Sequence, residues 1–281
     1  MRTKITIISI LSIFVIGLSG VAAQGTDRVA NSRPPFPYTL GWGMDGALVA
    51  ADLGLFGSSV YFQSIKSAPN SRDVDSSTIP FFDLLYTSDH SLTQATVSDI
   101  LAYTSLFALP AVFVPTENFG NLTTLVVMYG ETMGLTYSLA ALGKATITRY
   151  RPYAYSSSIG ASEFSNADIA GSFPSRHTIM GFASATFVGT VYDQLYPDSP
   201  YRPAVWGAGL GLAIGTAVLR VTSGEHFLSD VVAGAVLGSL SGWAIPYLHL
   251  RQNRSLEVGK VPTVSLMPTP TGFLVDWKLD Q

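Results

Sequence analysis

The 281-residue chain contains no cysteine and few charged residues. Without cysteine it forms neither disulfides nor thiolate metal sites, and the redox compartment stays open. Charged residues make up 12% of the chain, whereas globular proteins have about 25%. The formal net charge of −3 lacks the basic excess that a nucleic-acid partner requires. With 47% hydrophobic residues, the chain must bury much of its surface in a helical core or in lipid.

The first residues have the pattern of a secretory signal. A short basic segment precedes an apolar run, and Val21-Ala22-Ala23 then provides the small residues that signal peptidase recognises. We expect residues 1–23 to be a signal peptide that is cleaved after Ala23. The alternative is an uncleaved anchor helix of similar length. Residues 24–40 are polar and proline-rich, which predicts an extended lead-in.

Helical patterns dominate the chain after this lead-in. Six segments rich in apolar and small residues are separated by turn signals, at about 41–62, 98–115, 120–148, 177–195, 203–221 and 226–248. Small residues allow helices to pack closely, in a membrane or in a soluble bundle. Residues 251–281 differ, because two runs with β character flank Pro268 and Gly272. The sequence predicts an all-α six-helix bundle over residues 41–250 and a C-terminal tail with a short β-hairpin.

Polar clusters lie at the ends of these segments. In the first, Lys144 and Arg151 are seven residues apart, so a helix places both on one face before Pro152 ends it. The second is Pro174-Ser175-Arg176-His177, where the proline sets a turn ahead of a helix. The backbone N–H groups at the start of a helix attract anions. Both clusters therefore predict an anion site.

The third cluster begins at Arg220 and contains His226 and Asp230. These two residues are four apart, so on a helix the carboxylate accepts a hydrogen bond from one imidazole nitrogen and leaves the other free to attack. Gly224 permits the sharp turn ahead of His226. Cations and a helix N-terminus suit a phosphate oxyanion, one histidine suits a nucleophile, and a second histidine, His177, suits a general acid.

In this order, K-x6-R-P, P-S-x-H and R-x5-H-x3-D resemble the three signature motifs of the type-2 phosphatidic acid phosphatase and vanadium haloperoxidase superfamily. The resemblance covers about residues 40–250 and implies the six-helix layout with the active site at helix ends. It implies a metal-free phosphatase in which His226 forms a phosphohistidine, Asp230 orients His226, and His177 protonates the leaving oxygen and later activates water. The implied phosphate-binding residues are Lys144, Arg151, Ser175 and Arg220, with Arg176 as a further candidate.

Two residues depart from the family pattern. Arg176 stands where the family has glycine, and it either adds a cation to the phosphate site or points away from it. Its backbone N–H is retained, so we expect the anion site to survive and the catalytic efficiency to be affected. Leu219 stands where the third motif has serine, which removes at most one supporting hydrogen bond.

Other charged residues and histidines receive no catalytic role from the sequence. We interpret His90 and His249 as structural or exposed, because they lie outside every motif. Arg149 is interpreted as a charge flanking a membrane helix or as a solvated side chain. Glu131 lies within an apolar helical segment, where it is either functional or paired with another helix, and it stays unassigned.

The number of membrane spans decides which way the site faces. If all six helices span after export, the site lies in the cytoplasm and the basic tail outside, against the positive-inside tendency. If the first does not span, as Asp45 and Asp52 favour, the site faces the periplasm. A soluble periplasmic enzyme is a third alternative, since the last two apolar runs, about 16 residues each, are shorter than a span requires. We expect an exported, periplasm-facing and membrane-associated protein.

The leading functional hypothesis is hydrolysis of a phosphomonoester or diphosphate on a lipid-linked substrate, such as a phospholipid, a polyprenyl phosphate or a lipopolysaccharide phosphate. The alternatives are a soluble non-specific acid phosphatase, a vanadium-dependent haloperoxidase and an inactive membrane scaffold. The length of 281 residues counts against a haloperoxidase. We expect no metal and no cofactor; vanadate would act as an inhibitor, or as the cofactor of a haloperoxidase. The sequence indicates neither the alcohol nor the oligomeric state.

Overall fold

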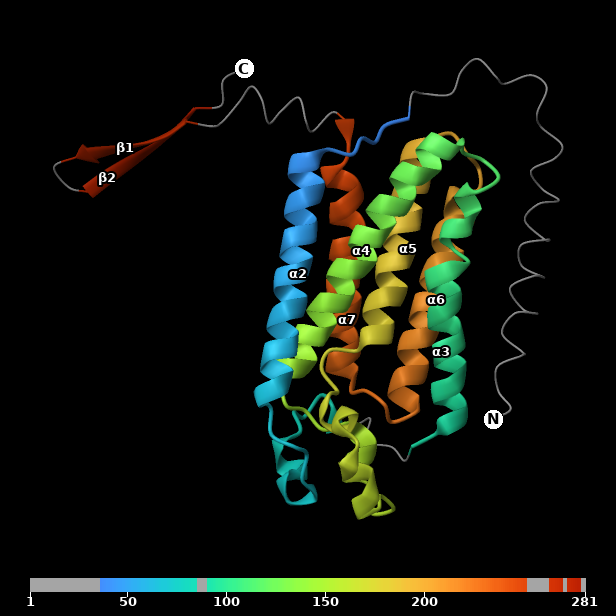
Figure 1. Cartoon of the computed structure of the whole chain (residues 1–281), viewed down its shortest axis with the longest axis vertical. Helices are drawn as coiled ribbons and strands as arrows, with labels where there is room; N and C mark the ends of the chain where they lie inside the picture. The colour runs from blue at the N-terminus through green and yellow to red at the C-terminus, as the bar shows by residue number, and fades with distance from the viewer. Residues whose placement is uncertain (1–35, 85–89, 252–262, 270–271, 279–281) are drawn as a thin grey trace.

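The computed structural model describes residues 36–84, 90–251, 263–269 and 272–278 (Figure 1). The predicted signal peptide and most of the predicted lead-in lie outside these residues. Within them are six α-helices: α2 (Trp42–Ile65), α3 (Leu92–Phe107), α4 (Phe119–Thr146), α5 (Arg176–Leu195), α6 (Arg202–Thr222) and α7 (Leu228–Leu248). The predicted all-α fold of the domain is confirmed.

Side-chain caps fix two of the helix starts. The Ser91 hydroxyl accepts a hydrogen bond from the backbone N–H of Gln94, so α3 begins at Leu92, ahead of the predicted start at residue 98. The Asn118 side chain accepts from the backbone N–H of Asn121 at 2.9 Å and starts α4 in the same way. These caps set the register of the two helices.

The central helix of the bundle is α5, which contacts α3, α4, α6 and α7. Its closest approach is to α7, where Gly234, Gly238 and Gly242 recur at every fourth position. A Cβ atom at Gly238 would collide with the carbonyl oxygen of Ile179 on α5, so only glycine permits this backbone contact. At one end of this contact the backbone N–H of Ser175 donates to the carbonyl of Asp230 at 3.1 Å. The starts of α5 and α7 are therefore held side by side.

The largest apolar core lies between α3, α4 and α5. Its buried members include Leu109, Phe113, Leu125, Met128, Phe187, Val188 and Val191. At that end of the bundle Tyr38 pairs with Leu250 in an isolated β-bridge, which joins the two ends of the domain. The loops at 66–84 and 147–175 gather at the opposite end, where α5 and α7 begin (Figure 1). The apolar core thus stabilises the packing of the helices. The loops at the opposite end lie outside this core and can contribute polar side chains to a site.

The outer faces of the helices carry many exposed apolar side chains, among them Leu53, Val126, Val218 and Leu240. Five helical segments within the described residues are long and apolar enough to cross a membrane: Trp42–Ile65, Leu92–Phe113, Phe119–Thr146, Arg202–Thr222 and Leu228–Leu248. By length and composition, the expectation that α2 is a poor span and that the last two helices are too short was therefore wrong. Exposed apolar faces on such helices indicate membrane association.

Beyond the helices, Thr263–Thr269 (β1) and Gly272–Lys278 (β2) are paired antiparallel, with Thr263 opposite Lys278. These strands form a two-stranded sheet only with each other and add nothing to the helical layers. The all-α domain is thus established without these strands. A C-terminal β-hairpin as a component of the fold stays a prediction.

Candidate active site

All three sequence motifs lie at the loop end of the bundle. Lys144 is in the last turn of α4 and Arg220 in the last turn of α6, whereas Asp230 is in the first turn of α7. Ser175 precedes α5 as its N-cap, and His177 lies in the first turn of that helix. Residues that are far apart in the sequence therefore gather at one end of the fold.

The first motif reaches the site differently from the prediction. Helix α4 ends at Thr146, so Lys144 and Arg151 do not share a helix face. The chain instead continues extended, and Arg149 forms a parallel bridge to Gly171. The Arg151 backbone N–H donates to the carbonyl of Ile169 at 2.9 Å, and the Lys144 ammonium donates to the carbonyl of Gly171. This pairing brings both cations to the start of α5.

In the second motif Ser175 is fully buried and its hydroxyl lies 2.9 Å from that of Thr178. The side chain makes no cap hydrogen bond to the α5 backbone. Arg176 lies with its guanidinium carbon 5.6 Å from the centre of the Tyr137 ring and lines the same cleft as Lys144. Arg176 therefore lies with Lys144 at this cleft, and its contribution to phosphate binding stays a prediction.

The third motif corrects a second prediction. His226 lies just ahead of α7 rather than on it, and its Nδ1 is 3.7 Å from Asp230 Oδ2. This Nδ1 atom is buried and has no hydrogen-bond partner among the described residues. The expected orienting hydrogen bond is absent because Asp230 serves other donors. Gly224 has a φ of 76°, which confirms that the turn before His226 requires glycine.

Asp230 is an acceptor for three other groups. Its Oδ2 accepts from the Ser172 hydroxyl at 2.6 Å and from the backbone N–H of Phe227 at 2.9 Å, and its Oδ1 accepts from Arg149. Arg149 also pairs with the fully buried Asp83. The interpretation of Arg149 as a flanking or solvated charge was therefore wrong. Its guanidinium joins two buried carboxylates beneath the site.

Three further acids that the sequence reasoning missed contact the predicted phosphate-binding cations. Arg151 pairs with Asp168 and Glu225, and Arg220 pairs with Asp99. Longer contacts join the same acids to the site: Lys144 Nζ to Asp168 Oδ1 at 3.9 Å, Arg220 NH1 to Glu225 Oε2 at 3.7 Å, and His177 Nε2 to Asp99 Oδ1 at 3.3 Å. The cations therefore already hold carboxylates where an anionic ligand would bind.

Both site histidines are held neutral by their surroundings. Burial, and then the positive charges of Arg151, Lys144 and Arg220, lower the pKa of His226 well below its ordinary value. Burial, and then the charge of Arg176, lower the pKa of His177 to about 4. Neutral imidazole is the form that can act as a nucleophile.

A cleft of about 520 Å³ opens beside Lys144 and Arg176, and its lining includes neither His177 nor His226. It lies between the last turns of α2 and the ends of α4 and α5, and its lining includes Val60, Ala141, Lys144, Asp168 and Arg176. Lys66 closes one edge of it by donating to the carbonyl of Ile147 at 3.3 Å. The cleft combines apolar walls from α2 and α4 with a cationic end.

The same region matches a known family. Residues 125–254, which contain all three motifs, match the family model of the PAP2 superfamily. This part of the chain is similar to the domains of the PAP2 superfamily. The PAP2 match is narrower than the predicted resemblance, because it begins within α4 and leaves out α2 and α3. The match to this superfamily model supports a phosphatase activity, of the phosphoric ester hydrolase class.

Two other comparisons add little to the PAP2 assignment. No curated protein matches the chain. Among solved structures, the chain is similar to the crystal structure of the first transmembrane PAP2 type phosphatidylglycerolphosphate phosphatase from Bacillus subtilis. The identity is 15% and the TM-score 0.42, over 92% of this chain and 100% of that one. We base no inference on so distant a likeness.

Proposed function

We propose that the protein is a membrane-associated phosphatase that hydrolyses a phosphomonoester or diphosphate of a lipid-linked substrate through a phosphohistidine. The observation that carries this proposal is the placement of two neutral histidines, His226 and His177, among Lys144, Arg151 and Arg220 within the region that matches the PAP2 superfamily model. A nucleophile, a proton donor and an anion site are the three parts that such a reaction requires.

Substrate binding begins at the cations in this proposal. The phosphate oxygens replace the Asp168 and Glu225 carboxylates on Arg151, and they contact Lys144 and Arg220. Arginine binds phosphate in the same forked geometry as it binds carboxylate, so the exchange requires little movement of the guanidinium. The free N–H groups at the start of α5, beside Ser175, add to the anion site.

The chemical step transfers phosphorus from oxygen to nitrogen. With its proton on Nδ1, towards Asp230, His226 attacks phosphorus through Nε2. The phosphorus–oxygen bond of the ester breaks, and His177 gives its proton to the departing alkoxide. The bound phosphate charge raises the pKa of His177 and so favours the protonated form that this step needs.

Hydrolysis of the intermediate then restores the enzyme. Neutral His177 removes a proton from a water molecule, whose oxygen attacks phosphorus. The phosphorus–nitrogen bond breaks, phosphate leaves, and His226 is neutral again. No metal ion is required by these steps, since the cations and the start of α5 neutralise the phosphate charge.

A lipid-linked substrate is favoured over a soluble one by the surroundings of the site. The cleft beside Lys144 and Arg176 is walled by α2 and α4, two of the five candidate spans. An apolar tail held there or in the bilayer places its phosphate at the cationic end. The apolar outer faces also disfavour the alternative of a soluble periplasmic enzyme.

We propose a periplasm-facing site on the charge of the C-terminal tail alone, since the earlier ground, a first helix that does not span, was wrong. The tail after α7 contains Arg251, Arg254 and Lys260, and basic segments favour the cytoplasmic side. This tail follows the end of the bundle opposite the site, so the site would lie outside (Figure 1). A cleaved export signal ahead of a spanning α2 gives the reverse orientation, and labelling from outside the cell distinguishes the two.

The first test is phosphate release by the purified chain in detergent with EDTA, from a panel of lipid phosphates and one soluble ester. We expect release that persists in EDTA, and a loss of more than about 10⁴-fold in kcat for His226→Ala, because the nucleophile is gone. The matched control is Asp193→Asn, which changes an acid near the end of α5, away from the site, and should retain activity.

A covalent trap makes the test specific to the mechanism. Brief reaction with a ³²P-labelled substrate should label the wild type with an acid-labile phosphate, and His226→Ala should stay unlabelled. No phosphate release from any substrate by folded wild type would overturn the proposal. Halide oxidation after addition of vanadate would then assign a haloperoxidase.

A further inference from the structure

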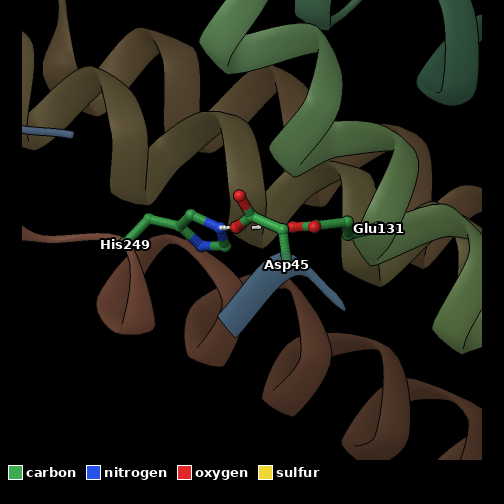
Figure 2. A group of neighbouring side chains, drawn as sticks. All are labelled: Asp45, Glu131 and His249. Carbon is green, nitrogen blue, oxygen red and sulfur yellow. Dashed lines mark hydrogen bonds and ion pairs between the residues drawn. The ribbon is translucent and has the colours of Figure 1, made fainter. Parts of the chain in front are cut away.

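A second buried polar cluster lies at the end of the bundle opposite the candidate active site. Asp45 from the first turn of α2, Glu131 from α4 and His249, directly after α7, converge there (Figure 2). His249 Nε2 lies 2.9 Å from Asp45 Oδ1 and 3.3 Å from Glu131 Oε2. The His249 side chain is fully buried, and that of Glu131 is 7% exposed. Neither residue belongs to a sequence motif.

The hydrogen bonds fix the tautomer of His249. Its Nδ1 lies 2.8 Å from the carbonyl oxygen of Ile245, and because a carbonyl only accepts, Nδ1 carries the proton. In a neutral imidazole the lone pair of Nε2 would then face the carboxylates of Asp45 and Glu131, which also only accept. A proton or a bound cation must therefore lie between Nε2 and these carboxyl groups.

A proton alone leaves the cluster incomplete. One N–H at Nε2 is satisfied by Asp45, the nearer carboxylate. Both carboxylate oxygens of Glu131 then stay buried with no hydrogen-bond partner among the described residues. Two carboxylates around one imidazolium also leave a net negative charge in apolar surroundings, which is costly. A divalent cation would instead neutralise both carboxylates and use all three ligand atoms.

The spacing of the three ligand atoms suits such an ion. Metal–ligand bonds of 2.0–2.2 Å place neighbouring ligand atoms about 2.8–3.6 Å apart. The two separations from His249 fall in this range, and all three ligand atoms lie within 4.8 Å of one another. The Nδ1–H bond to a carbonyl is also the usual support of a metal-bound histidine, and Asp45 is held in turn by the backbone N–H of Gly41 at 2.6 Å.

We propose that Asp45, Glu131 and His249 bind a divalent transition metal, with Zn²⁺ as the first choice. One imidazole and two carboxylates suit Zn²⁺ or Mn²⁺ better than Mg²⁺ or Ca²⁺, which prefer oxygen ligands only. The role we assign to the ion is structural. It ties α2, the least covered of the five candidate spans, to α4 and to the end of α7. Helix α7 spans about 30 Å, so the ion lies far from His226.

The test measures metal binding by the full chain in detergent. After EDTA treatment and removal of the chelator, calorimetric titration should show one Zn²⁺ per chain, and Tm should rise with Zn²⁺ concentration. We expect Glu131→Gln and Asp45→Asn each to weaken Zn²⁺ binding at least tenfold. The control Glu225→Gln removes an acid from the candidate active site and should leave the stoichiometry and affinity unchanged.

The control also separates this site from the catalytic one. Binding that is unaffected by Glu131→Gln and Asp45→Asn but weakened by Glu225→Gln would assign the metal to the active-site acids and overturn the proposal. Folded wild type that binds neither Zn²⁺ nor Mn²⁺, with an unchanged Tm, would leave His249 as an imidazolium and overturn it as well. If the proposal holds, EDTA lowers Tm, yet phosphate release measured well below Tm persists.

Discussion

Replacing Asp230 and Asp83 separately tests whether the carboxylate next to His226 supports the fold or only the chemistry. Both acids are fully buried and both bind Arg149. Asp230 accepts in addition from Ser172 and from the Phe227 backbone, and Asp83 accepts twice from Ser229, at 3.0 and 2.6 Å. Each carboxylate thus has three protein donors, but only Asp230 faces His226.

The expected loss of stability follows from these contacts. All three donors bind an ionised carboxylate, and a hydrogen bond to a charged group contributes about 1.5–3 kcal/mol, so the three together contribute at least about 4.5 kcal/mol. Removing one partner of a buried ion pair costs a similar amount, about 3–5 kcal/mol. At roughly 2–4 °C per kcal/mol for a chain of this size, Asp230→Ala and Asp83→Ala should each lower Tm by about 10 °C.

The assay combines thermal unfolding in detergent with phosphate release at a temperature where both variants are folded. We expect equal losses of Tm but unequal losses of kcat. Asp230→Ala should be slower than Asp83→Ala by about 10²-fold or more, because only Asp230 places a negative charge 3.7 Å from Nδ1 of His226, where the proposed attack leaves a positive charge on the imidazole. An unchanged Tm for Asp230→Ala would refute the assignment of Asp230 as a structural acceptor. Equal losses of kcat would refute its specific effect on His226.

Four further predictions concern pH, the site, the packing and the orientation. The pKa of His177 is about 4 in the folded protein and near 6.5 in the unfolded chain. The contribution of His177 to the free energy of unfolding is therefore greatest above pH 6.5 and falls by up to about 3 kcal/mol as the pH drops to 4. His177→Asn should flatten this part of a Tm–pH profile. Arg176→Gly should raise KM for a phosphate ester by roughly fivefold with little change in kcat, since it removes a cation worth about 1 kcal/mol at the cleft, as steady-state kinetics would reveal. Gly238→Ala should lower Tm by overpacking of about 1–3 kcal/mol against Ile179. Gly207→Ala, which meets no atom within 4 Å, should instead raise Tm slightly, because alanine favours the helix. In whole cells an impermeant maleimide should label Ser71→Cys at the loop end and not Asp198→Cys at the other, and the reverse pattern would place the site in the cytoplasm.

Much of the helical fold could be predicted from local patterns. The apolar runs and the turn residues between them marked each helix, and the three motifs were placed correctly at one end. Local patterns failed where a polar stretch is helical. The first residues of α3 have no apolar periodicity, and they are helical because the Ser91 cap starts the helix ahead of them. They also failed after Thr146, where an extended segment pairs with Gly171 instead of continuing α4.

The partners of the motif residues could not be predicted, because they lie far away in the sequence. Asp83 is separated from Arg149 by 66 residues and from Ser229 by 146, and nothing near it in the sequence marks it as buried. Asp99 reaches Arg220 across 121 residues. Spacing identifies groups that share one turn or one helix face, and it contains no information about contacts made by the packing of separate helices. The role of Asp230 was misjudged for this reason.

The acids around the phosphate-binding cations have a consequence for selectivity. Arg151 and Arg220 are already paired with Asp168, Glu225 and Asp99. In the proposed function a ligand therefore enters by ion exchange, and its affinity is the difference between the binding of two anions to the same cations. A monovalent carboxylate or sulfate ester would gain little over the resident carboxylates. A phosphomonoester dianion carries one more negative charge than the carboxylate that it replaces, so its exchange is favourable. The protein's own acids therefore select for doubly charged ligands over singly charged ones.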